Sequence, residues 1–567
     1  MSAALYRVLP LVLIASAALA RGDDRLRELQ ERAVATRDQR LPRPYHFGSQ
    51  APNDVFTNHG SHTNRLIPVY TFGSKADLGA VTGENSRYRT EEGVRSLFGV
   101  LPPNTVNPDA VYADQSDLYR VQKNAAARGA KYIFTVWFDG LDWDTTRAAA
   151  IVKAGRVGYS EGKGTGLVFQ DYDAAGTARF GFVVTAPTHD KTVVDVDRQT
   201  VALAPGTLGG GYDPMIAGPT PWTPGPLFAQ ARGYLKGQSA SETDRDGVAK
   251  VGRVLHAYTD SAPSAGEFST GVKSYNTSIN VAEDGRFAPT LFNELQAKGW
   301  AVGIASSVVF DDASPAATYA HNVSRGDCQD LGREMLGLPS IVQETGKGPR
   351  LPGLDVVIGC GEGHAINHRD VSHHGLNAAK GGYLSDDDLA AIDARRGGPY
   401  VVVRSTPGVE GPSALRSAAD RAAGEGKRLF GLFGSSTQGH LPFRTADGDF
   451  RPVAGASGKA ESYSAEDLRM NPTLSGMTEA ALAVLAARKT PFALFVEAGD
   501  VDWALHDNNL DNAVGAVFSG EEAVRTIIAW VEAHSNWDES VLIVTADHGH
   551  YLVLDDPEAL VAGPPKP

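Results

Sequence analysis

The chain is poor in cysteine and in basic charge, and each shortage excludes a class of protein. Its 567 residues include two cysteines, Cys328 and Cys360, which is too few for a disulfide-dense scaffold. They could form one disulfide or remain two buried thiols. Asp and Glu number 67 against 53 Lys and Arg, for a formal net charge of -14. With no basic run to offset that charge, nucleic acid and anionic membranes are excluded as expected partners.

The chain also lacks an apolar run long enough to cross a bilayer. The run at 8–20 follows a single charge, Arg7, and ends in Ala18-Leu19-Ala20, a small-residue cleavage pattern. Residues 1–20 are therefore predicted to be a signal peptide. We expect export to the periplasm or the extracellular space and no membrane span.

The remaining composition is that of an ordinary globular protein, with 42% hydrophobic and 21% charged residues. Apolar runs of strand length alternate with helical patterns, most regularly after residue 258. This alternation predicts an α/β fold: a doubly wound, mostly parallel central sheet with helices on both faces. The strands are expected at 65–72, 131–138, 300–306, 354–358, 400–403, 429–433, 492–496 and 541–545.

Residues 155–250 have a different character, being rich in Gly, Pro and Thr with short β-like runs such as 180–185. They are predicted to be a β-rich insertion packed beside the main sheet. The expected organisation is a leader at 1–20, the first part of the catalytic domain at 21–154, the insertion at 155–250, the main catalytic part at 251–555 and a tail at 556–567.

Metal-capable side chains follow three of the expected strands. Asp139 follows KYIFTVWF, Glu497 follows FALFV, and Asp547-His548 follow VLIVTA. A single Asp at a strand end is commonly a turn or capping residue. Because ligands gather outside the carboxyl ends of strands in doubly wound sheets, three such ends favour a shared metal site.

A second pair, Asp502 and His506, is separated by four residues. On a helix the two side chains lie on one face and can bind one ion together. Such a pair is more often a surface ion pair, but its position soon after Glu497 favours a metal site.

Ser261 lies in the run His256-Ala257-Tyr258-Thr259-Asp260-Ser261-Ala262-Pro263. The proline is tolerated in the first turn of a helix, so Ser261 is expected at a helix N-terminus. There the amide donors and the positive end of the dipole favour an alkoxide or a bound phosphate. An ordinary capping serine is the alternative.

Together these motifs resemble the alkaline phosphatases. The resemblance covers roughly residues 131–150 and 251–550. It also includes the runs Ser269-Thr270-Gly271-Val272-Lys273-Ser274-Tyr275-Asn276, Asp312-Ala313-Ser314-Pro315-Ala316-Ala317 and Thr545-Ala546-Asp547-His548-Gly549-His550. It implies a phosphatase that hydrolyses small-molecule phosphate monoesters, with two zinc ions and one magnesium ion, and it leaves open a homodimer.

The resemblance implies that Ser261 is the nucleophile and forms a phosphoserine intermediate. The zinc ion that activates Ser261, and that Ser261 itself contacts, would be held by Asp139, Asp547 and His548. Two zinc ions about 4 Å apart can stabilise both the attacking and the departing oxygen.

The resemblance assigns the second zinc ion to Asp502 and His506, together with a histidine from a later segment. No histidine follows His550 in this chain, and His550 itself matches a family histidine that is not a ligand. The run His62-Thr63-Asn64-Arg65-Leu66-Ile67-Pro68-Val69-Tyr70 resembles the missing segment. We therefore hypothesise a circular permutation with His62 as the missing ligand; His59 or an ordinary loop histidine is the alternative.

The magnesium ion would be held by Asp139, Ser314 and Glu497, an all-oxygen set that suits this ion. Arg325 matches the arginine that binds the phosphoryl oxygens; without the motif, a surface arginine would be an equally good interpretation. Asp312 could hold a metal-bound water or be an ordinary loop carboxylate. One departure from the family is Phe138, where a glycine is common.

The expected function is thus that of an exported alkaline phosphatase. One rival keeps the fold but hydrolyses phosphodiesters, phosphonates or sulfate esters. Another is a non-catalytic metal- or phosphate-binding protein, supported by the incomplete second zinc site.

Overall fold

The structure is a computed structural model. It describes residues 25–36, 62–63, 65–223, 256–362, 383–435, 439–455, 457–550, 552, 554 and 556–562. The predicted leader, 1–20, lies outside these residues.

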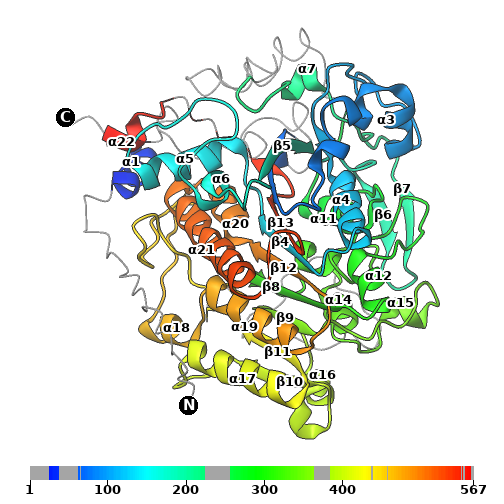
Figure 1. Cartoon of the computed structure of the whole chain (residues 1–567), viewed down its shortest axis with the longest axis vertical. Coiled ribbons are helices and arrows are strands. Elements are labelled where there is room, and N and C mark those ends of the chain that lie inside the picture. Colours follow the sequence, from blue (N-terminus) through cyan, green and yellow to red (C-terminus); the bar gives the residue numbers. More distant parts are fainter. Residues whose placement is uncertain are drawn as a thin grey trace, which may run out of the picture.

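A ten-stranded sheet runs through the centre of the molecule (Figure 1). Its strands in spatial order are β10 (Tyr400–Arg404), β11 (Arg428–Phe433), β9 (Val356–Cys360), β8 (Ala301–Val309), β12 (Phe492–Ala498), β4 (Tyr132–Phe138), β13 (Ser540–Thr545), β2 (Ile67–Phe72), β5 (Arg179–Val184) and β3 (Ala113–Asp114). All neighbours pair in parallel except β2, which is antiparallel to both β13 and β5. The predicted fold class is confirmed.

The central strands are buried along nearly their whole length. Every residue of β8 and β12 is buried, as are the last six residues of β4. This burial on both faces explains why these strands appear in the sequence as continuous apolar runs.

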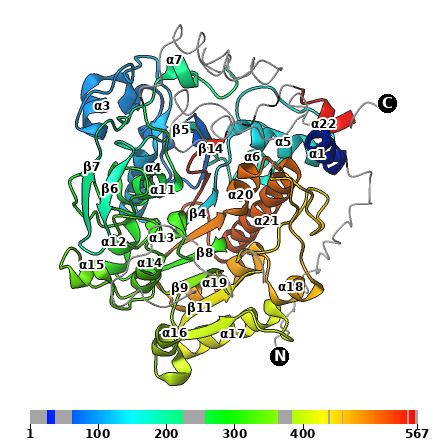
Figure 2. The same ribbon diagram turned by 180° about the vertical axis from the view of Figure 1, so that it is seen from behind.

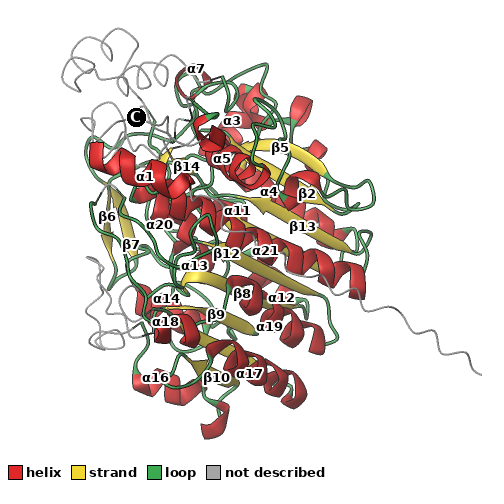
Figure 3. Cartoon of the chain, turned by 90° about the vertical axis from the view of Figure 1, so that its left-hand side faces the viewer, coloured by secondary structure: helices red, strands yellow, loops and turns green. Residues whose placement is uncertain are grey.

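Helices cover both faces of the sheet (Figures 1 and 2). One layer contains α17 (Gly411–Glu425), α19 (Leu474–Ala487) and α21 (Leu510–His534), which pack side by side against β10, β8 and β4 respectively. The other contains α4 (Gln115–Ala127), α11 (Ser261–Thr270), α12 (Leu291–Ala297) and α13 (Ala313–Ala317). Figure 3 shows the strands stacked one after another with helices along them.

The other described elements are shorter or peripheral. The helices are α1 (Arg25–Thr36), α3 (Glu91–Phe98), α5 (Trp143–Ala154), α6 (Val168–Asp171), α7 (Pro214–Ala217), α14 (Cys328–Met335), α15 (Ile341–Glu344), α16 (Asp386–Ile392), α18 (Ala465–Met470), α20 (Asp500–His506) and α22 (Ala559–Ala562). The 3-10 turns are η1 (Leu78–Ala80), η2 (Gly83–Asn85), η3 (Arg87–Arg89) and η6 (Ala394–Arg396). Two small sheets pair β6 (Thr192–Asp195) with β7 (Thr200–Leu203) and β1 (His62–Thr63) with β14 (Gly549–His550).

The predicted insertion is more closely integrated than expected. Its strand β5 does not pack beside the main sheet but belongs to it, as the neighbour of β2. On its side away from β13, β2 would otherwise leave its backbone N–H and C=O groups unpaired. Strand β5 pairs with β2 there over five residues. Within the described part of 155–250, only β6 and β7 form a separate sheet.

The two ends of the described chain lie together. Helix α1 packs against α21 and α22, and Arg25 donates a hydrogen bond to the carbonyl of Val561. Leu29 of α1 is fully buried. The N-terminal segment is therefore part of the folded domain.

Both cysteines are buried and free. Of the two alternatives left open by the sequence, they are therefore two buried thiols and do not form a disulfide. Burial raises the pKa of each thiol well above its usual value. Among the described residues, no helix is both long enough and apolar enough to cross a membrane.

Candidate active site

The register of three neighbouring strands brings the predicted ligands to one edge of the sheet. Trp137 of β4 lies opposite Glu497 of β12 and opposite Thr545 of β13. Asp139 and Asp547 come two residues after these positions, just past the ends of β4 and β13. Because the three strands are parallel, Asp139, Glu497 and Asp547 meet at the carboxyl ends of these strands.

The first cluster consists of Asp139, Asp547 and His548, whose ligand atoms lie within 4.8 Å of one another. The Nε2 of His548 is 3.4 Å from Oδ1 of Asp139 and 3.4 Å from Oδ2 of Asp547. All three residues are buried. Nitrogen and carboxylate ligands in this number fit a catalytic zinc site with an open position.

Ser261 lies beside this cluster. It is the first residue of α11, and its Oγ is 3.2 Å from Nε2 of His548. Asp260 caps the helix by accepting a hydrogen bond from the N–H of Ala262 at 3.0 Å. The hydroxyl therefore lies at the positive end of the α11 dipole, next to a possible ion.

The second cluster consists of Asp502, His506 and His550. Asp502 and His506 are on α20, and the Nε2 of His506 is 3.3 Å from Oδ2 of Asp502. The Nε2 of His550 is 2.6 Å from Oδ1 of Asp502. Both predicted residues of the second zinc site are thus brought together, and His550, set aside from the sequence, joins them.

His62 lies close to this cluster by its backbone. It pairs with His550 in the antiparallel β1–β14 ladder. The described structure does not include the side chain of His62, and His59 lies outside the described residues. The role of either histidine as a ligand stays a prediction.

The residues predicted to hold magnesium are all buried. Glu497 accepts a hydrogen bond from Ser306, its partner across the β8–β12 ladder. Burial raises the pKa of Glu497 to about 8, with further contributions from nearby carboxylates. Ser314 lies in the first turn of α13 and interacts with Glu497.

Arg325 is half-buried and is held at the edge of the site by Asp312. Its Nη2 is 2.8 Å from Oδ1 of Asp312, which also caps α13 through the N–H of Ala313. Burial works against the charged guanidinium, but Asp312 and Asp260 hold the pKa of Arg325 above its usual value. Asp312 therefore positions the arginine.

The excess of buried negative charge indicates cations. Burial and the neighbouring charges of Asp547, Asp502 and Glu497 raise the pKa of Asp139 well above its usual value. Oδ1 of Asp139 and Oδ2 of Asp547 find no hydrogen-bond donor among the described residues. Buried carboxylates that repel one another and lack donors are stabilised by divalent ions, so these residues fit the metals implied by the sequence.

Two functional positions were missed from the sequence. Gly140 has φ +71, and a Cβ there would lie 2.5 Å from Nε2 of His550; its N–H also donates to Oδ1 of Asp547 at 2.9 Å. The hydroxyl of Ser264 donates to the carbonyl of Asp547 at 2.6 Å. The glycine after a strand-end Asp was a usable signal, whereas nothing in the sequence marked Ser264.

The unusual Phe138 is accommodated by a glycine elsewhere. A Cβ at Gly520 of α21 would lie 2.3 Å from the ring of Phe138, which also packs against Phe169 with ring centroids 5.4 Å apart. The larger side chain therefore points toward the α21 layer, and the chain continues directly to Asp139.

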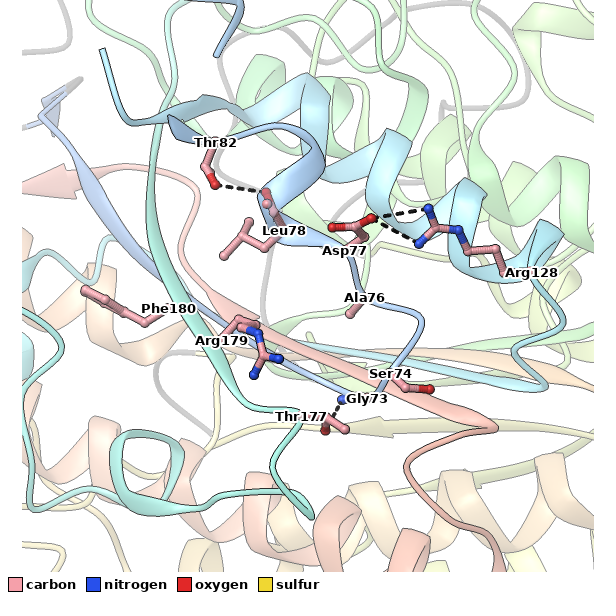
Figure 4. Close-up of a pocket in the computed structure, with 11 residues that line it drawn as sticks. Gly73, Ser74, Ala76, Asp77, Leu78, Thr82, Arg128, Thr177, Arg179 and Phe180 are labelled. Carbon is pink, nitrogen blue, oxygen red and sulfur yellow. Dashed lines mark hydrogen bonds and ion pairs between the residues drawn. The ribbon is translucent and has the colours of Figure 1, made fainter. Parts of the chain in front are cut away.

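A cavity of about 420 Å³ lies at the other end of the sheet (Figure 4). It is lined by residues from the end of β2, from η1 and from the start of β5, among them Arg179 and the ion pair of Asp77 with Arg128. None of the predicted site residues that the structure describes lines it.

Comparison with known proteins identifies the family. A sequence profile described as alkaline phosphatase matches residues 229–559, more than half of the chain. The chain belongs to the alkaline phosphatase family. Asp139 and His62 lie outside the matched residues.

Individual relatives are similar to this chain at moderate identity. Alkaline phosphatase H of Pseudomonas aeruginosa is 29% identical over 359 residues, which cover 59% of this chain and 68% of that protein. Alkaline phosphatase of Escherichia coli is 28% identical over 353 residues, covering 59% and 69%. Streptomycin-6-phosphate phosphatase of Streptomyces griseus is 26% identical over 333 residues, covering 56% and 66%.

Solved structures of the family are also similar. A cold-active alkaline phosphatase of Shewanella sp. matches at 17% identity and TM-score 0.40, covering 74% of this chain and 68% of that one. The alkaline phosphatase of Thermus thermophilus matches at 20% identity and TM-score 0.42, covering 75% and 60%.

Proposed function

We propose that this chain hydrolyses phosphate monoesters through a phosphoserine intermediate on Ser261. The observation that carries the proposal is the 3.2 Å approach of Ser261 Oγ to His548, a member of the buried Asp139, Asp547 and His548 cluster. A nucleophile at a helix N-terminus beside a metal-ligand set is suited to phosphoryl transfer.

The chain's own residues would bind and orient the substrate. The Oγ of Ser261 attacks phosphorus while the alcohol leaves on the opposite side, and water later hydrolyses the phosphoserine. Arg325 would hold two non-bridging oxygens of the phosphoryl group in its planar fork. Asp312 keeps the guanidinium in place for this role.

Two zinc ions and one magnesium ion, when bound, would lower the pKa of the nucleophile and stabilise negative charge on the oxygens. Asp139, Asp547, His548 and Ser261 would hold the first zinc ion. Asp502 and His506 would hold the second, with His62 completing the site and His550 hydrogen-bonded to Asp502. Asp139, Ser314 and Glu497 would hold the magnesium ion.

Preference for monoesters over diesters rests on Arg325. A guanidinium that binds two non-bridging oxygens favours a dianionic monoester end. The alternative substrates are phosphodiesters, phosphonates and sulfate esters. Comparing the turnover of each class with that of a phosphate monoester would decide between them. We further propose that the enzyme acts after export on small-molecule substrates.

A labelling experiment tests the function. The purified protein, loaded with zinc and magnesium, is expected to hydrolyse an aryl phosphate monoester faster than the matching diester. Brief acid quenching should trap labelled phosphate on wild-type protein but not on Ser261→Ala. Ser269→Ala, about two turns further along α11, is the matched control and should label normally. Label that persists in Ser261→Ala would refute the assignment of the nucleophile, and absence of any turnover would favour a binding protein.

A further inference from the structure

The first residue of α4 contacts the strand end that carries two of the predicted ligands. Gln115 is fully buried, and its Nε2 donates a hydrogen bond to the carbonyl of Ala546 at 2.8 Å. Ala546 directly precedes Asp547 and His548. Gln115 lies outside the residues matched by the family profile.

The next carbonyl in the same strand end is held from another helix. Ser264 of α11 donates to the carbonyl of Asp547 at 2.6 Å. Two successive peptide carbonyls are therefore each fixed by a buried side chain, one from α4 and one from α11. Both carbonyls belong to residues that directly precede His548, whose Nε2 is 3.2 Å from Oγ of Ser261.

A buried ionic group joins α4 to α11. Lys273, just after α11, has its Nζ 2.7 Å from Oδ2 of Asp114 and 2.9 Å from Oε2 of Glu267. Asp114 is the N-cap of α4 and directly precedes Gln115. Because removal of one partner of a buried ion pair is costly, this group fixes the start of α4 against the nucleophile helix.

We propose that Gln115 is a positioning residue of the active site, which holds Asp547 and His548 in line with Ser261 through the carbonyl of Ala546. The inference rests on the proposed function. The role requires a donor of glutamine length: methionine fills similar space but cannot donate.

The alternative is that the buried amide of Gln115 has a purely structural role. Gln122 offers the matched control, because it is on the same helix and is also buried. Its Nε2 donates to a backbone carbonyl too, but to that of Phe268 in α11, at 3.4 Å. Phe268 is far along α11 from Ser261. A purely structural role would make the two glutamines equivalent.

The experiment compares Gln115→Met with Gln122→Met in the full chain. For Gln115→Met we expect zinc affinity, measured by titrating zinc alone into metal-free protein in a calorimeter, to fall about 10–100-fold. The kcat for an aryl phosphate monoester at saturating metal should fall by a similar factor, while KM changes little. Gln122→Met should lower the unfolding temperature but keep zinc affinity and kcat.

Gln115→Leu, which also lacks a donor, provides a second test if Gln115→Met does not fold, and it should also bind zinc more weakly. Equal zinc affinity and kcat in the Gln115 variants and Gln122→Met would overturn the proposal. If wild-type protein hydrolyses no phosphate ester, the proposed function fails, whereas the zinc titrations still decide the role of Gln115.

Discussion

The two metal-capable clusters share the same kinds of side chain but differ in their surroundings. Asp139, Asp547 and His548 have side chains that are 10%, 0% and 0% exposed, and they adjoin Ser261. In the second cluster the side chain of His506 is 38% exposed. The first is built on strand ends of the sheet, whereas the second depends on the seven-residue helix α20.

This difference in exposure predicts that the two sites bind their ions with different exchange rates. Ligands on strand ends are fixed by the sheet, and those on a short helix at the surface can open to solvent more easily. We therefore expect the first site to be essential and tightly held, and the second to exchange its ion more readily. In the proposed reaction the leaving alcohol must also escape into solvent, which suits the more open side.

Substitution in the buried cluster should have the largest effect. Asp547→Ala is expected to lower kcat/KM more than ~100-fold even with excess zinc, because it removes a proposed ligand beside the proposed nucleophile. Steady-state hydrolysis of an aryl phosphate monoester measures the loss. Asp507→Asn, at the end of α20 and hydrogen-bonded to Ser457, should stay within a few-fold of wild type. Similar losses of activity in Asp547→Ala and Asp507→Asn would show that the effect is not specific to the buried cluster.

Substitution of His62, the proposed completing ligand of the second cluster, should have the next largest effect. His62→Ala is expected to bind one zinc ion fewer and to lose ~10–100-fold in activity, because the Asp502 and His506 site would keep too few ligands. Elemental analysis of the purified protein measures the stoichiometry.

His59→Ala is the matched control for that experiment and should keep its metal. If instead His59→Ala loses the ion, the assignment moves to His59. If neither variant loses the ion and His550→Ala does, then Asp502, His506 and His550 bind the ion without a ligand from β1.

Chelation should separate the two sites without mutation. Added to zinc-loaded protein, a chelator is expected to remove one equivalent of zinc in an early phase and the second more slowly, because His506 is exposed and His548 is not. A zinc-sensitive dye follows the release. A single phase for both equivalents would show that exposure does not control exchange.

Much of the sheet and of this site could be predicted from the sequence, for a physical reason. Strands buried on both faces are continuous apolar runs, and β4, β12 and β13 therefore stand out together with the predicted ligands at or just after their ends. Parallel register then brings Asp139, Glu497 and Asp547 to one edge.

What escaped prediction depends on contacts between distant segments. The place of β5 in the sheet, and the hydrogen bonds from Gln115 and Ser264 to the strand end after β13, are set by packing and leave no periodic pattern. The same is true of Gly520, whose missing side chain makes room for Phe138.

A third buried acidic group, which contacts a lysine, sharpens the contrast. Lys273 contacts both Asp114 and Glu267, but Asp114 also accepts hydrogen bonds from Tyr88 and Ser116. Despite burial, Lys273 and then Arg87 hold the pKa of Asp114 below its usual value. Burial raises the pKa of Glu267 well above its usual value, and the charge of Asp114 adds to this.

Glu267 should therefore reduce stability as pH rises, and this is the smallest effect expected. Above the usual glutamate pKa the unfolded chain releases the proton while folded Glu267 keeps it, so stability falls through the window up to the raised pKa. Glu267→Gln lacks this titration. Its unfolding midpoint relative to wild type should rise between pH 5 and pH 8, by an amount on the order of 1 °C or more.

Thermal unfolding of metal-free protein at both pH values measures that difference without interference from the metal site. Glu294→Gln is the control: burial opposes the shift, but hydrogen bonds from Tyr119 and Lys123 lower the pKa of Glu294. Its folded-state pKa lies below the usual glutamate value, so any change in its midpoint relative to wild type should be small and confined to the acidic end of this window. A flat difference for Glu267→Gln as well would mean that Lys273 neutralises both carboxylates. In that case lysine would stabilise buried acids here as well as metal ions are expected to do at the active site.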